Sequence, residues 1–65
     1  MMTEILEKLN RAIEKIDRAI IMIQENVDLF SGKDLDILLA SLKSFREMRD
    51  IGMQLKTDIH VLKGE

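Results

Sequence analysis

Residues 6–30 read LEKLNRAIEKIDRAIIMIQENVDLF, which is four heptads with an apolar residue at both core positions of each. The first core position holds Leu6, Ile13, Ile20 and Val27, and the second holds Leu9, Ile16, Ile23 and Phe30. Apolar residues at this spacing form one continuous stripe along an α-helix. The stretch therefore predicts a long first helix over about residues 3–30, with Thr3 as its N-cap.

The segment Phe30-Ser31-Gly32-Lys33-Asp34 is the clearest break in the chain. Ser31 followed three residues later by Asp34 is typical of a capping box that opens a second helix. Alternatively, Gly32 ends the first helix in the left-handed conformation. Both interpretations give a turn at residues 31–33, and so short a connection makes the two helices antiparallel.

A second helix is predicted over about residues 33–62. Its stripe reads Leu35, Leu38, Leu42, Phe45, Met48, Gly52, Leu55, Ile59 and Leu62. The step from Phe45 to Met48 is one residue short of the regular spacing, which predicts a locally overwound seam. Folding about the turn places Gly52 opposite Ile13, and Phe45 opposite Ala19 and Ile20. Gly52 then makes room for close helix contact.

A single hairpin leaves much of both apolar stripes exposed, and 65 residues bury a small core. The chain has no cysteine, so disulfides cannot supply the missing stability. We expect an all-α antiparallel helical hairpin, one domain over residues 1–65, that forms a homodimeric four-helix bundle. The alternative is a hairpin whose core is completed by a different protein. The expected core comprises Leu6, Leu9, Ile13, Ile16, Ile20, Ile23, Val27, Phe30, Leu38, Leu42, Phe45, Met48, Leu55, Ile59 and Leu62.

Four further apolar residues, Ile21, Met22, Leu39 and Met53, fall at positions that are otherwise polar. Methionine and isoleucine in such places are typical of binding surfaces. We therefore take these four as a candidate patch for a protein partner. The competing interpretation is that four-helix packing buries them.

The sequence offers little for catalysis or metal binding. The paired carboxylates fall on the polar faces, the inward positions are aliphatic, and the one histidine, His60, stands near the end of the second helix. Asn26, at the edge of the stripe, is expected to hydrogen-bond locally or to help fix the register. We predict no enzymatic activity, no cofactor and no metal.

The net charge is −2, and the longest uncharged apolar run, Ala19 to Ile23, is far shorter than a membrane span. Charge begins at Glu4, which argues against a signal peptide. We therefore expect a cytoplasmic protein without a membrane segment.

The function expected is that of a small regulator or inhibitor, of the kind phages and plasmids encode, which binds a larger protein. The architecture resembles that of the small plasmid-encoded RNA-binding regulators of the Rop type, which are dimers of helical hairpins. That resemblance implies RNA binding as an alternative. Against it, Lys8, Arg11, Lys15 and Arg18 alternate with Glu7 and Glu14, a pattern typical of a solvated surface. A helical-hairpin co-chaperone of secretion subunits is a third possibility.

Overall fold

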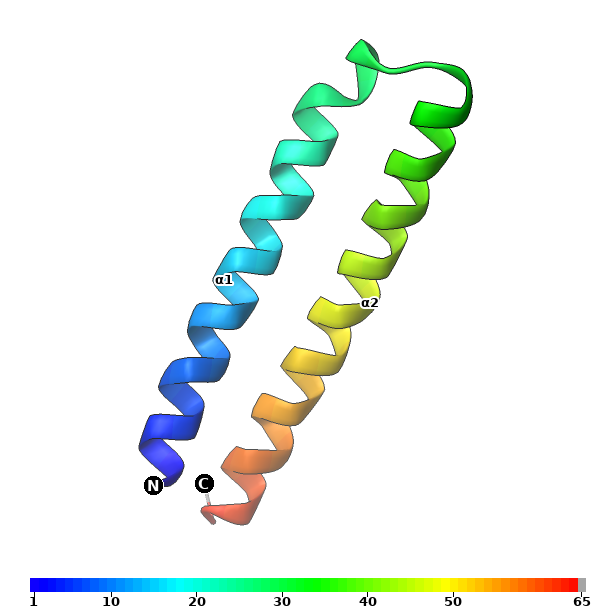
Figure 1. Cartoon of the computed structure of the whole chain (residues 1–65). Coiled ribbons are helices and arrows are strands. Elements are labelled where there is room, and N and C mark those ends of the chain that lie inside the picture. The colour runs from blue at the N-terminus through cyan, green and yellow to red at the C-terminus, as the bar shows by residue number, and fades with distance from the viewer. Residues whose placement is uncertain (65) are drawn as a thin grey trace.

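The computed structural model describes residues 1–64 as two long helices side by side (Figure 1). Helix α1 spans Met2–Asn26, a short 3₁₀ helix η1 spans Val27–Leu29, and α2 spans Gly32–Leu62. The helices run antiparallel, so both termini lie at the end opposite the turn. The expected all-α antiparallel hairpin is therefore confirmed. Of the described residues, no helix is both long and apolar enough to cross a membrane.

The first helix ends earlier than its heptads do. Asn26 leaves the α-helical conformation at φ −110° and ψ 1°, and its side-chain amide donates a hydrogen bond of 2.7 Å to the carbonyl of Met22. Asparagine side chains compete in this way with the helical backbone ladder. The local hydrogen bond expected of Asn26 is present, and the last stripe residue, Phe30, lies in extended backbone beyond η1.

The connection between η1 and α2 is Phe30 and Ser31, and it departs from both expectations for residues 31–33. Ser31 is the N-cap of α2 but makes no side-chain cap hydrogen bond. The residues of a capping box are therefore in place without the hydrogen bond that defines one. Gly32 is left-handed, at φ +58°, yet it begins α2 and does not end α1. At the other terminus, Met1 and not Thr3 is the N-cap, because Thr3 already lies within α1.

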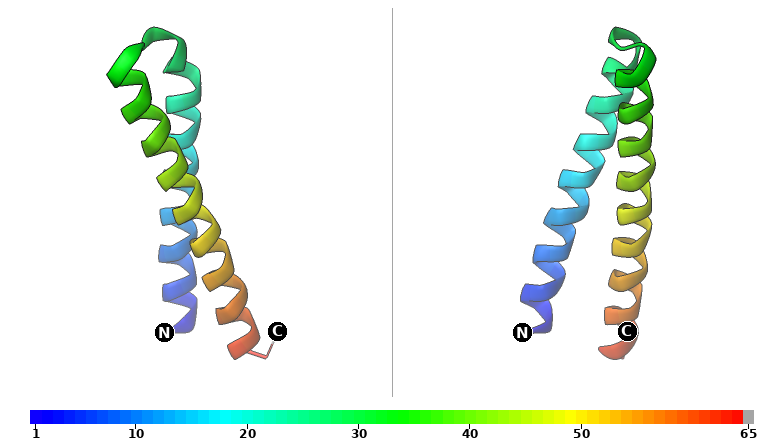
Figure 2. Two further views of the ribbon diagram at one scale, coloured as in Figure 1. Left: turned by 90° about the vertical axis from the view of Figure 1, so that its right-hand side faces the viewer. Right: turned by 45° about the vertical axis from the view of Figure 1, so that its right-hand side comes forward.

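The seam between the helices buries Leu6, Ile13 and Ile20 of α1 against Leu42 and Ile59 of α2. A Cβ added at Gly52 would lie 3.2 Å from Cγ1 of Ile13. The expected pairing of Gly52 with Ile13 is thus confirmed, and glycine is what lets the backbones approach there. Figure 2 shows the two helices inclined to each other along this seam.

The irregular step in the second helix has a different cause from the one expected. The half-buried seam of α2 runs on from Phe45 through Gly52 and Lys56 to Ile59, at regular heptad spacing. Met48 and Leu55, assigned to the core, are 50% and 47% exposed in the hairpin. The buried positions therefore keep a regular spacing. Met48 and Leu55 lie on a flank of α2, and the half-buried Lys56 takes a seam position with its aliphatic stem.

The hairpin is a rod, with extents of 49 × 14 × 14 Å and a radius of gyration of 15.0 Å. A compact domain of this length has a radius of gyration of about 11 Å. Two helices side by side form a single layer, so no side chain in the described chain is fully enclosed: the most buried core residue, Ile20, is still 5% exposed.

Candidate interaction surface

Exposed apolar side chains outnumber buried ones in the part of the chain that the structure describes. Five hydrophobic residues are buried, whereas fourteen large ones are exposed. Single exposed apolar residues are ordinary on protein surfaces, but a contiguous group of them marks an interaction site. Their arrangement on the helices therefore decides whether they form a site.

A second heptad row follows α2 outside the seam. At alternating steps of four and three residues it reads Ile37, Ser41, Ser44, Met48, Ile51, Leu55, Asp58 and Leu62. We call it the outer row. It extends over about 38 Å of helix and lies about 100° around α2 from the seam. Ile37, Ile51 and Leu62 are 65%, 69% and 75% exposed. Helix α2 thus has two apolar faces, and α1 covers only one of them.

The N-terminal half of the outer row is hollowed. An open groove of about 350 Å³ lies along α2, lined by Ile37, Ala40, Ser41, Ser44, Phe45 and Met48. The three small residues leave space between the larger side chains. The Ser41 hydroxyl donates a hydrogen bond of 3.0 Å to the carbonyl of Ile37, so it is already satisfied within the helix. The groove therefore suits an apolar side chain from outside.

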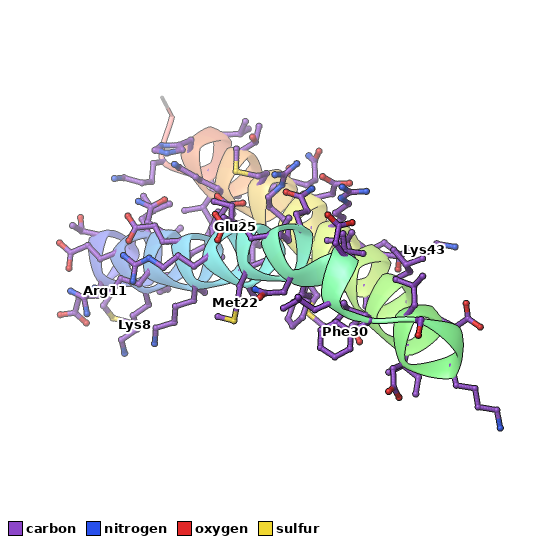
Figure 3. All side chains as sticks on the ribbon, turned by 90° about the horizontal axis from the view of Figure 1, so that it is seen from above. Lys8, Arg11, Met22, Glu25, Phe30 and Lys43 are labelled. Atoms are coloured by element: carbon purple, nitrogen blue, oxygen red, sulfur yellow. The ribbon has the colours of Figure 1, made fainter. Side chains whose placement is uncertain are left out.

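Helix α1 contributes a matching row on the same side of the hairpin. This flank row reads Ile5, Lys8, Ala12, Lys15, Ala19, Met22, Asn26 and Leu29. In the view along the helices, Met22 and Phe30 point to one side while Lys43 points to the other (Figure 3). Lys43 and the outer row lie on opposite flanks of the seam residue Leu42, so the outer row faces the Met22 side. The outer row and the flank row together are called the apolar face below.

The opposite face of the hairpin is polar. An ion pair of 3.4 Å joins Arg49 and Asp17 across the helices, with both side chains 45% exposed. The exposed charged residues on this side include Glu7, Glu14, Asp36, Lys43, Arg46 and Asp50. The two long sides of the hairpin therefore differ in character: one is apolar and grooved, and the other is charged.

The four residues of the candidate partner patch do not gather in one place. Met22 is 62% exposed and lies on the apolar face. Ile21, Leu39 and Met53 are 51%, 46% and 49% exposed but belong to the opposite face. Leu39 and Met53 are fourteen residues apart on α2, a rise of about 21 Å. Sequence reasoning missed the outer row because it merged the two apolar rows of α2 into one irregular stripe.

Some of the expected core residues lie in the seam between the helices, and others are exposed. The expected core residues from Leu6 to Ile23 of α1, and Val27 of η1, are buried or half-buried in the hairpin, and so are Leu38, Leu42, Phe45 and Ile59. Phe30, Met48, Leu55 and Leu62 are exposed. Met48, Leu55 and Leu62 belong to the outer row, whose other apolar members are Ile37 and Ile51.

The accessible surface of the hairpin, 5194 Å², exceeds that of a compact monomer. A compact protein of 7.5 kDa exposes about 4,250 Å². The excess of about 900 Å² is close to the 800 Å² or so that each partner buries in a standard protein interface. The hairpin therefore has surplus surface of the size that one specific partner covers.

In residues 1–64, no group of three or more His, Cys, Asp or Glu side chains is placed to hold a metal ion. His60 is half-buried near the C-terminal end of α2 and has an interaction within the chain. The groove is lined by aliphatic, hydroxyl, thioether and aromatic groups.

No protein-family model matches the chain, and neither the curated proteins nor the solved structures contain a significant match to it.

Proposed function

We propose that this protein is a non-catalytic helical interaction protein. Two copies associate through their apolar faces into a four-helix bundle, and the dimer regulates or inhibits a larger protein by occupying part of its surface. The single observation that carries the proposal is the apolar face, with its outer row of exposed apolar residues along α2. A soluble hairpin with this much uncovered apolar surface needs a partner to bury it.

Dimerisation is tested by sedimentation equilibrium of the full chain over a range of micromolar concentrations. The expected mass is twice 7.5 kDa. A fully helical species at the monomer mass throughout that range would contradict the proposal, because the apolar face would then be stable in water.

The larger partner is proposed to bind the opposite face, where Ile21, Leu39 and Met53 interrupt the charged surface. The test is affinity capture from the native host with the wild-type chain and with Leu39→Lys and Met53→Glu, both of which leave the apolar face intact. A captured protein should be lost with these variants. If both variants retain every captured protein, this face is not the binding surface.

RNA binding remains a second candidate because four exposed cations, Lys8, Arg11, Lys15 and Arg18, follow one side of α1. The interhelical ion pair uses none of them, since it joins Asp17 and Arg49. RNA binding would weaken steeply with salt, in proportion to the number of phosphates contacted. Neutralising all four cations would abolish such binding, whereas binding that ignores salt would exclude this function.

A further inference from the structure

We infer that the second copy binds the apolar face with its two-fold axis parallel to the helices. In this arrangement each α1 packs against the partner's α2, and both turns lie at the same end of the bundle. The inference rests on the proposed dimerisation through the apolar face and adds to it the helix pairing and the register.

The register follows from contacts within one hairpin. Because Gly52 lies against Ile13, residues of α1 and α2 whose numbers add to about 65 lie at the same height. Rotation about a two-fold axis parallel to the helices leaves the height of every residue along that axis unchanged, so equivalent residues of the two copies lie level. The flank row of α1 then meets the partner's outer row at nearly the same heights. The residue numbers of each facing pair add to 66 or 67.

Large residues meet small ones in the middle of this register. Ala12 faces the partner's Leu55, Ala19 faces the partner's Met48, and Met22 faces the partner's Ser44 in the groove. Alternation of large and small side chains across facing rows is how helical layers interdigitate. The groove of about 350 Å³ is thus filled by a methionine, a flexible side chain suited to irregular space.

The ends of the rows match in polarity. Ile5 faces the partner's Leu62, and Leu29 faces the partner's Ile37. Lys8 lies opposite the partner's Asp58, so opposite charges meet where the outer row carries its only ionisable residue. Lys15 lies opposite the partner's Ile51, which its aliphatic stem covers while the ammonium group reaches water.

A two-fold axis perpendicular to the helices would instead pair α1 with α1 and α2 with α2. Lys8 and Lys15 of both copies would then gather along one contact, because the flank row contains no carboxylate. With the two copies overlapping over their full length, Asp58 would face the partner's Ser41 and no cation. Charge complementarity therefore selects the parallel axis.

The face is tested by two variants that introduce the same charge on α2, two residues apart. Leu55 and Met53 are equally exposed in the hairpin, at 47% and 49%, but only Leu55 lies on the apolar face. Leu55→Lys should raise the dimer dissociation constant at least about 100-fold in sedimentation equilibrium, because it buries a charge without a partner. Met53→Lys should leave the constant within about threefold. Equal effects of the two variants would overturn the assignment of the face.

The helix pairing is tested by charge reversal at Lys8 and Asp58, two exposed positions outside the seam. Lys8→Glu alone should weaken dimerisation about two- to thirtyfold over the two symmetric contacts, and Asp58→Lys should do the same. The double variant K8E/D58K should recover the wild-type constant, with unchanged helicity by circular dichroism throughout. A double variant that is no better than the singles would overturn the parallel axis. A wild-type chain that is monomeric would instead refute the proposed dimer itself.

Discussion

Enlarging Gly52 tests whether close helix contact holds this hairpin together. A Cβ at position 52 would already lie 3.2 Å from Cγ1 and 3.6 Å from Cδ1 of Ile13. Leucine adds three further heavy atoms beyond that Cβ, so Gly52→Leu cannot be accommodated without moving the helices apart or displacing Ile13, which is only 8% exposed.

Two opposing terms set the size of the effect. Replacing glycine by leucine within a helix gains about 1 kcal/mol of helix propensity. Overpacking a contact of this kind costs about 1–3 kcal/mol. We expect Gly52→Leu to lower the free energy of unfolding by about 1 kcal/mol. Gly52→Ala should change it by less than about 0.5 kcal/mol, because the propensity gain offsets a single close contact.

Shortening Ile13 in the same chain separates packing from propensity. Ile13→Ala alone should cost about 2 kcal/mol, at the low end for a core isoleucine because one side of the seam is open. In the double variant the leucine side chain fills the vacated space, so the two losses should not add, and a coupling of about 2 kcal/mol is expected.

The measurement is urea unfolding followed by circular dichroism, with all variants at one protein concentration because association contributes to stability. Additivity within about 0.5 kcal/mol would refute direct packing of Gly52 against Ile13. Stabilisation of the chain by Gly52→Leu alone would refute the close contact itself.

Three further substitutions test the turn, the ion pair and the seam under the same unfolding assay. Gly32→Ala should lower the free energy of unfolding by about 1–2 kcal/mol through backbone strain at φ +58° alone, since an added Cβ meets nothing within 4 Å. Gly32→Asn should lower it less, because asparagine tolerates the left-handed conformation. Equal losses for the two variants would exclude backbone strain as the cause. Asp17→Ala should change stability by no more than about 0.5 kcal/mol, a difference that 1 M salt should remove, because both partners of the Asp17–Arg49 pair are half exposed. Lys56→Leu should raise stability by about 0.5–1 kcal/mol at its half-buried seam position, whereas the same change at exposed Gln54 should not.

Much of the fold could be predicted because helix periodicity is a local property. The heptads of residues 6–30 indicate α1, and the Ser31-Gly32 break separates it from α2. The pairing of Gly52 with Ile13 followed from the short turn, since a turn of so few residues leaves little freedom in register. Predicting the helix end was harder: the stripe continues to Phe30, but the side chain of Asn26 competes for the backbone and ends α1.

The candidate surface could be predicted only in part. The sequence shows the surplus of apolar residues and includes Met48 and Leu55 among them. It does not show on which face of α2 these two residues lie. Apolar residues at steps of three and four are compatible with two adjacent stripes as well as with one irregular stripe. Sequence pattern alone therefore placed Met48 and Leu55 in a single core with Leu42 and Ile59.

The sequence by itself determined two long helices, an antiparallel turn and an excess of apolar side chains, because these depend on spacing along the chain. Only the tertiary structure decided which apolar residues the first helix covers. The contact of Gly52 with Ile13 sets the rotation of α2 about its own axis, and that rotation turns Lys56 toward the seam and Leu55 away from it. The physical reason is that a helix can present one stripe to one neighbour, so a second stripe on α2 remains for another.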